Sequence, residues 1–231
     1  MSSATSEREI VLGLVKVFQD QGLYACGSIG PSKLSKWGCL DHLRSMSHPC
    51  QPEIDILWYY PDKEKLHAGE VKYFRLSKKR KRKATPVPPF AYEFYLLTNP
   101  EPSYQSLYDK IDETLTPKSY YNGIDEALSL LNYGVDYAWL IHIFDVGVWS
   151  IGEGYSSWTL KAVQHTPLGY YVIYSNDEVK GHRLKEPTYL AEKKAALKRL
   201  REKLIRGLLT DPDCRPTRSR DDEFSKTLEE Y

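Results

Sequence analysis

Long apolar runs are missing from this 231-residue sequence, and their absence removes membrane-spanning proteins from consideration first. No hydrophobic stretch approaches the roughly 20 residues that a transmembrane helix needs. The N-terminal residues MSSATSEREIV also lack the apolar region of a secretory signal. We therefore expect a protein without a membrane partner that is cytoplasmic, or nuclear if its source has a nucleus, with reduced cysteines.

Cysteine is scarce as well, at four residues, and no C-x-x-C motif occurs. Cys39, His42, His48 and Cys50 lie close together in the chain, but their spacing, C-x2-H-x5-H-x-C, matches no regular zinc knuckle. The favoured interpretation is a set of free loop cysteines and histidines, with a structural zinc site as the weaker alternative.

An excess of one charge is missing overall, because 32 basic and 31 acidic residues leave a net charge of +1. One segment departs strongly from this balance. Residues 78–83 read KKRKRK, six consecutive cations, whereas the residues from Asp221 onward are rich in acids. The basic run is typical of a segment that contacts nucleic acid or that directs a protein to a nucleus.

Hydrophobic periodicity predicts an α/β protein with one sheet flanked by helices. The segment 27–52 is rich in Gly, Ser, Pro and Cys and is expected to be loop-like. We expect a single domain over residues 1–209 and a polar, frayed tail over residues 210–231. Helices are predicted over 6–21, 104–115, 122–133 and 185–209, and strands over 53–60, 65–75, 90–97, 137–144, 159–164 and 170–175.

The two strands around residues 53–75 carry charges where the pattern enters a core. Side chains two apart in a strand share a face, so Glu70 and Lys72 point the same way. Pairing of the two strands would bring Asp55 beside Glu70. A salt-bridge ladder on a solvated face is the simpler interpretation of such a pattern.

Two features favour a metal site over that ladder. Aspartate is a poor strand former, yet Asp55 lies inside the apolar stretch EIDILW. Two neighbouring carboxylates also repel each other unless they share a positive charge. Hard oxygen ligands suit Mg²⁺ or Mn²⁺, so we predict that Asp55 and Glu70 hold one of these ions.

This stretch resembles the signature of the PD-(D/E)xK nuclease superfamily. Asp55, at the end of PEID, is followed after fourteen residues by Glu70-Val71-Lys72, which keeps the E-x-K half of the signature. The resemblance implies a restriction-endonuclease-like fold, a mixed central sheet flanked by helices in the order α-β-β-β-α-β. Some branches carry a Gln and a Tyr at fixed spacing on the helix after the E-x-K strand, and this sequence has no such pair.

The N-terminal half also resembles archaeal Holliday-junction resolvases, which carry a glutamate on a helix before the strands. Positions 7, 11, 14 and 18 form one face of the predicted helix, and three of them are apolar. Glu7 therefore faces the protein body, whereas Glu9 lies on the wet face. An acid favoured by the helix dipole is the competing interpretation of Glu7.

The resemblance implies metal-dependent hydrolysis of phosphodiester bonds in DNA, the activity of a Mg²⁺-dependent endodeoxyribonuclease. Asp55, Glu70, Glu7 and the Val71 carbonyl would be metal ligands, and Lys72 would act on the attacking water. A catalytically silent nuclease fold that binds nucleic acid or a partner protein is the alternative. RNA is the alternative substrate, and a homodimer is compatible with the resemblance. The candidate phosphate contacts are Lys78, Lys79, Arg80, Lys81, Arg82 and Lys83.

Overall fold

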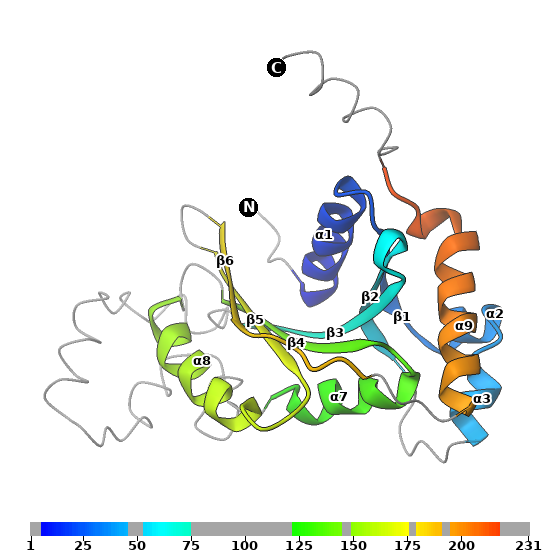
Figure 1. The fold of residues 1–231 in the computed structure, drawn as a ribbon. Helices are drawn as coiled ribbons and strands as arrows, with labels where there is room; N and C mark the ends of the chain where they lie inside the picture. The colour runs from blue at the N-terminus through cyan, green and yellow to red at the C-terminus, as the bar shows by residue number, and fades with distance from the viewer. Residues whose placement is uncertain are drawn as a thin grey trace, which may run out of the picture. The chain divides into compact units, whose positions relative to one another are not determined.

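The computed structural model describes residues 6–45, 53–74, 122–144, 149–175, 179–190 and 195–217. It confirms the expected α/β class: six strands form one sheet in the order β1-β2-β3-β4-β5-β6, with helices packed on it (Figure 1). β2 pairs antiparallel with both β1 and β3, and β5 pairs antiparallel with β6. The strands are β1 (Tyr24–Ile29), β2 (Ile54–Tyr60), β3 (Lys65–Phe74), β4 (Tyr137–Phe144), β5 (Gly169–Ser175) and β6 (Val179–Lys185).

Helices and short 3-10 turns connect these strands. The α-helices are α1 (Glu7–Asp20), α2 (Pro31–Lys36), α3 (Leu40–Ser45), α7 (Ile124–Ser129), α8 (Trp149–Val163) and α9 (Ala195–Thr210). The 3-10 turns are η1 (Pro61–Lys63), η3 (Leu130–Tyr133) and η4 (Pro212–Cys214). No helix among the described residues is long and apolar enough to cross a membrane.

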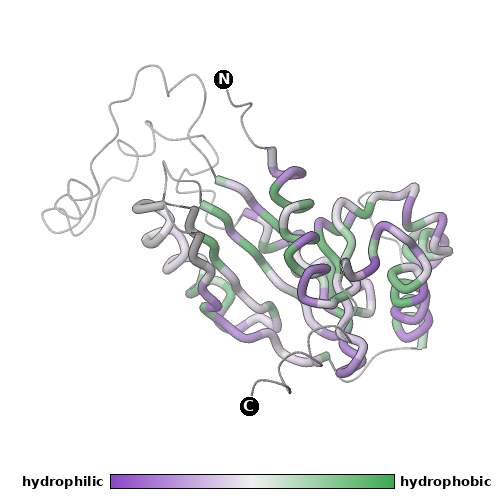
Figure 2. Tube along the Cα trace, turned by 90° about the horizontal axis from the view of Figure 1, so that it is seen from above, coloured by the Kyte–Doolittle hydropathy of each residue, from purple (hydrophilic) through white to green (hydrophobic). Residues whose placement is uncertain are grey.

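The chain divides into two compact units, each assembled from separate segments. The first unit comprises Met1–Glu70, Ala127–Trp139 and Thr188–Tyr231. The second unit comprises Val71–Glu126 and Leu140–Pro187. Apolar residues gather along the strands of both units (Figure 2), as the alternation and the apolar runs of the sequence predict.

Helix α1 of the first unit begins where the sequence predicts. Ser6 is its N-cap, and a capping box joins the Ser6 hydroxyl and the Glu9 carboxylate. The apolar face of α1 packs on β1 at Gly27, where a Cβ would lie 2.7 Å from a methyl carbon of Val11 and 3.0 Å from one of Val15. Glycine at this position therefore sets how closely the helix approaches the strand.

A buried ion pair joins α9 to the start of β4 in the same unit. The Asp136 carboxylate is 2% exposed and lies 2.7 Å from the Arg201 guanidinium. It also accepts a hydrogen bond from the backbone N–H of Leu66 at 2.8 Å. Removing one partner would leave the other charge buried, which typically costs about 3–5 kcal/mol. Arg201, one of the basic residues of α9, therefore has a structural role in this ion pair.

One prediction of secondary structure is wrong in the first unit. The segment 27–52, expected to be loop-like, contains the end of β1 together with α2 and α3. The short strand YACGSI has weak strand propensity, and its position follows from pairing with β2 and packing under α1. Of the predicted tail, the structure describes residues 210–217, where Asp211 and Cys214 are buried and the Thr217 N–H donates to the Gln19 carbonyl.

The second unit contains a further correction. The segment predicted as a strand over 159–164 is the last part of α8, in which the Thr159 hydroxyl donates to the Tyr155 carbonyl one turn back. The partner of β5 is instead β6, and the long helix predicted over 185–209 begins only at Ala195, as α9. The predicted strand 90–97 and helix 104–115 lie outside the described residues.

Candidate active site on strands β2 and β3

Asp55 and Glu70 lie on neighbouring strands of the first unit, each one residue beyond the last pair of the β2–β3 ladder. The antiparallel register of β2 and β3 runs from Tyr60–Lys65 to Ile56–Gly69, and one further step along both strands sets Asp55 opposite Glu70. Residues opposite each other share a face of the sheet, with Cβ atoms roughly 4.5–5.5 Å apart. The expected pairing of these two strands is therefore confirmed.

Another opposite pair in the same ladder illustrates this geometry. Trp58 and His67 face each other in the register, and their rings stack with centroids 5.1 Å apart. Alternation of side chains assigns Asp55 and Glu70 to the face away from this aromatic pair. The two carboxylates thus share one face of the strand pair.

Glu70 is unusually buried for a glutamate. Its side chain is 8% exposed, and its strand neighbours Gly69 and Val71 are buried, whereas Asp55 is half-buried. Lys, Glu, Arg and Asp are almost never buried to this extent unless they are paired. Burying a glutamate carboxylate costs solvation free energy unless it is paired.

Lys72 lies two residues beyond Glu70 on β3 and belongs to the second unit. Its ammonium is 2.5 Å from the Glu126 carboxylate of α7, and its side chain is 16% exposed. Gly123, at φ +81°, allows the turn before α7 to contact the Lys72 stem, since a Cβ there would lie 3.0 Å from Lys72 Cγ. Contacts at both the aliphatic stem and the ammonium group therefore restrict the position of the Lys72 side chain.

Glu126 is a residue that the sequence reasoning missed. It stands in the first turn of α7, which follows the E-x-K strand after a long intervening segment. An acid at a helix N-terminus is common for reasons of capping and dipole alone, so its position gives no specific signal. Only the contact with Lys72 identifies it.

A hollow of about 360 Å³ lies beside Asp55 in the first unit. Glu7 contributes to it, whereas Glu9 is engaged by the N-cap of α1. Glu7 is exposed, although the sequence predicts that it faces the protein body, and it lies near Asp55 but not Glu70, which does not line this hollow. Helix α1 packs on the Trp58 face of the strand pair, through Phe18, and not on the face assigned to the two carboxylates. The lining residues are Glu7, Arg8, Val11, Ser28, Glu53 and Asp55.

The donor set fits a hard divalent cation. Asp55 and Glu70 supply carboxylate oxygens, and Mg²⁺ is usually bound by one or two carboxylates together with water and substrate phosphates. Within the described part of the chain, no group of three or more His, Cys, Asp and Glu side chains gathers to hold a metal. The fit therefore rests on two carboxylates, with Glu7 and the Val71 carbonyl as expected further ligands.

His142 in β4 is a core residue, and His67 in β3 is half-buried. His142 is fully buried, with its ring nitrogens 3.0 Å from the Tyr170 hydroxyl and 3.2 Å from the Asn122 carbonyl. Burial lowers its pKa to about 3. His67 accepts a hydrogen bond from Trp139 Nε1 at 3.1 Å, and burial lowers its pKa to about 4. Both rings are neutral at pH 7.

The basic run, residues 78–83, lies outside the described residues. No protein-family model, no curated protein and no solved structure matches the chain. The candidate site is thus defined by its own geometry, an Asp–Glu pair across two strands with a lysine further along the second strand.

Proposed function

We propose that this protein is a metal-dependent nuclease that hydrolyses phosphodiester bonds in DNA. The observation that carries the proposal is the register that sets Asp55 opposite Glu70, with Lys72 on the same face of β3. The order of elements also supports it. Among the described residues, the order α1, β1, β2, β3, α7, β4 follows the α-β-β-β-α-β order that the resemblance implies, apart from α2 and α3 between β1 and β2. Residues 75–121, between β3 and α7, lie outside the described part of the chain.

Each residue has a distinct part in such a reaction. A bound Mg²⁺ would lower the pKa of a water molecule and neutralise charge that builds up on the phosphoryl group. Asp55 and Glu70 would hold the cation, and Glu7 would extend the acidic set at the neighbouring hollow. Lys72 would orient the attacking water and stabilise negative charge in the transition state. Glu126, through its contact with Lys72, would position the ammonium.

Cleavage of supercoiled plasmid DNA tests this proposal. The wild-type protein is expected to nick the plasmid with Mg²⁺ or Mn²⁺ and to be inactive with EDTA. Asp55→Asn and Glu70→Gln should each abolish nicking while DNA binding is kept. Asp62→Asn makes the same charge change on η1, the exposed turn of the same strand pair, and should cleave like the wild type. Equal cleavage by all variants would point to a contaminating nuclease and refute the assignment.

Binding of nucleic acid without cleavage is the second candidate function. It is favoured by the absence of a third carboxylate, histidine or cysteine close to the pair among the described residues. Under this alternative, the wild-type protein would bind DNA in a salt-dependent manner and leave it intact with every divalent ion. The same plasmid assay, run beside a binding titration, distinguishes the two functions.

A further inference from the structure

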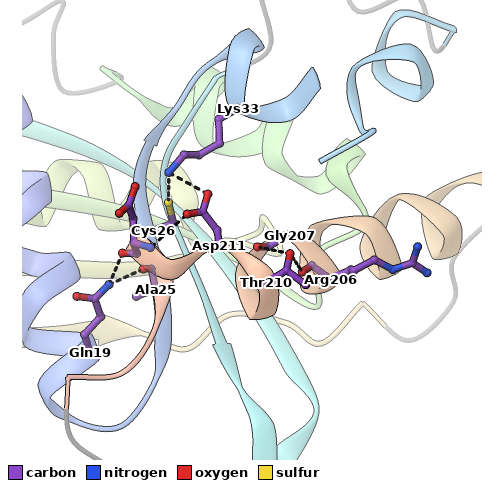
Figure 3. A network of polar contacts seen from close by, with 9 residues as sticks. Gln19, Ala25, Cys26, Lys33, Arg206, Gly207, Thr210 and Asp211 are labelled. Atoms are coloured by element: carbon purple, nitrogen blue, oxygen red, sulfur yellow. Dashed lines mark hydrogen bonds and ion pairs between the residues drawn. The ribbon is translucent and has the colours of Figure 1, made fainter. Parts of the chain in front are cut away.

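A compact cluster of nucleophilic and charged side chains lies in the first unit, separate from the candidate active site. The Lys33 ammonium of α2 is 3.1 Å from the Cys26 Sγ of β1 and 3.5 Å from the Asp211 carboxylate (Figure 3). Cys214 lies on η4, which packs against β1, and its thiol is close enough to Cys26 to affect the pKa of that residue. Two cysteines that are 188 positions apart in sequence thus meet beside one lysine.

The surroundings give the two thiols opposite properties. The hydrogen bond from Cys214 and the nearby Lys33 ammonium lower the pKa of Cys26 to about 7, although burial opposes this change. The hydrogen bond with Cys26 and burial raise the pKa of Cys214 well above its usual range. Cys26 is therefore the thiolate and Cys214 the protonated partner, the division of roles found where one cysteine attacks and a second resolves.

A third buried cysteine of the same unit has no such environment. Cys39 is fully buried, and that burial raises its pKa to about 11. At pH 7 it is a protonated, unreactive thiol. It serves as an internal control for the effect of burial alone.

A hollow borders the cluster on the Asp211 side. Asp211, the ion-pair partner of Lys33, lines a hollow of about 170 Å³ together with Trp37 and Arg206. One carboxylate oxygen of Asp211, Oδ2, is buried and makes no hydrogen bond within the described residues, and its nearest charged partner is Lys33. The cluster is thus buried from large reagents but lies next to a solvent-accessible hollow.

We propose that Cys26 and Cys214 form a peroxide-reactive dithiol, a modification site that hydrogen peroxide converts into a disulfide between β1 and η4. This proposal is independent of the nuclease activity. It follows from the packing of η4 on β1, which brings Cys214 to the Cys26 strand, and from the Lys33 ammonium, which lies 3.1 Å from the Cys26 sulfur. Cys26 is the attacking residue and Cys214 the resolving residue.

The reaction balances in two steps. The Cys26 thiolate attacks one peroxide oxygen, the O–O bond breaks, and the released hydroxide takes a proton and leaves as water. Cys26 is then a sulfenic acid, and its sulfur has given two electrons to the peroxide. The Cys214 sulfur attacks the Cys26 sulfur, the S–O bond breaks, and the departing hydroxide takes the Cys214 proton as a second water. Two thiols and one peroxide thus give one disulfide and two waters.

Thiol mapping of the folded, full-length protein tests the proposal. The reduced chain is treated with a small excess of hydrogen peroxide at pH 7, alkylated and digested for mass spectrometry. We expect a mass loss of two hydrogen atoms, a linked Cys26–Cys214 peptide, Cys39 still alkylated, and reversal by dithiothreitol. A Cys50→Ser background removes the thiol that lies outside the described residues.

Variants of Lys33 test its part without removing a cysteine. Lys33→Met should slow disulfide formation at pH 7 by about fivefold, as expected if the thiol pKa rises by one unit, and should move the pH profile upward. Lys33→Arg keeps the positive charge and should retain most of the rate. Lys16→Met, which removes an exposed lysine of α1, is the matched control and should react like the wild type.

Three results would overturn the proposal. In the first, Cys26 and Cys214 stay reduced in the folded protein under conditions that oxidise the urea-unfolded chain. In the second, Cys26 is converted to sulfinic acid without forming a disulfide. In the third, Cys39 reacts as fast as Cys26, which would show that the lysine and the second thiol give no selectivity.

Discussion

At the scale of single residues, the most informative contact is the one between Lys72 and Glu126. A lysine on a strand face is usually a flexible surface residue, but Lys72 has its stem against Gly123 and its ammonium on a carboxylate. A fixed ammonium is useful to a reaction that develops negative charge, because it needs little reorganisation when the charge appears. The glutamate then acts through the lysine, and its loss should cost less activity than loss of the lysine.

This difference gives a graded prediction. Lys72→Met should lower the rate of plasmid cleavage by about 10²–10⁴-fold, the usual contribution of a positioned acid or base. Glu126→Gln should lower it by about tenfold, as is typical for a residue that orients another. Single-turnover rates across pH distinguish the two, since Glu126→Gln should also shift the pH profile. Equal losses in both variants would show that Glu126 contacts the substrate or supports the fold.

His142 gives a residue-scale prediction about stability. Its pKa is about 3 in the folded chain because of burial, against an ordinary value of 6.5. Between these values the unfolded chain binds a proton that the folded chain does not, so stability is complete above about pH 6.5 and falls as the pH drops towards 3. The slope from this one group reaches about 1.4 kcal/mol per pH unit.

Urea unfolding between about pH 4.5 and pH 7 measures that slope. His142→Gln should flatten the dependence on pH, even if it lowers stability at pH 7 through loss of the Tyr170 contact. The exposed His165 is the control, and His165→Gln should leave the slope unchanged. An unchanged slope in His142→Gln would mean that the ring is protonated in the folded state.

At the scale of elements, the packing of α1 on β1 depends on one absent side chain. Gly27 has a φ that any residue could adopt, so the constraint is space: a Cβ would lie 2.7 Å from a carbon of Val11. Because α1 carries Glu7 to the hollow beside Asp55, this contact also determines where that acid lies.

Gly27→Ala should therefore destabilise the protein by about 1–3 kcal/mol, the usual cost of overpacking. In a Val11→Ala background the same change should cost less, because the methyl groups in its way are gone. Gly13→Ala in α1, where nothing lies within 4 Å, is the matched control and should add up to about 1 kcal/mol of stability. Denaturant midpoints of the four variants and the wild type give the coupling energy between Gly27→Ala and Val11→Ala. Strictly additive effects of the two changes would contradict the predicted clash.

Elements with a strong local pattern could be predicted from the sequence, and those fixed by tertiary contacts could not. β2 and β4 are largely apolar runs, β3 follows β2 after a polar turn, and α1 has both a capping box and a glycine stop. β1 contains Gly and Ser and depends on its neighbours for its conformation. The end of α8 contains Thr159 and Val163, β-branched residues that favour a strand locally but belong to a helix here.

The residues of the candidate sites fall into the same two groups, those predicted from local sequence and those positioned by tertiary contacts. Asp55, Glu70 and Lys72 follow from strand periodicity and the E-x-K spacing, because both are local in sequence. The partners Glu126 and Cys214 reach their positions through long connections whose paths no local pattern specifies. Sequence reasoning therefore found the strands that carry the chemistry and missed the residues that other elements bring to them.

At the scale of the whole molecule, a metal bound only by the folded chain must raise its stability. A ligand at 100 times its dissociation constant adds about 2.7 kcal/mol to the free energy of unfolding. For a chain of this length, that corresponds to a rise of roughly 5–10 °C in Tm. Mn²⁺ and Mg²⁺ should both produce the shift, whereas NaCl at equal ionic strength should not.

The site variants turn this shift into a test of where the cation lies. Asp55→Asn and Glu70→Gln should each remove most of the rise in Tm, because a hard cation loses one of two carboxylate ligands. Asp62→Asn, on η1, should keep the full rise. If all three variants respond like the wild type, the cation binds elsewhere and the Asp55–Glu70 pair is not its site. This measurement depends only on binding, so it tests the carboxylate pair even in a protein that cleaves nothing.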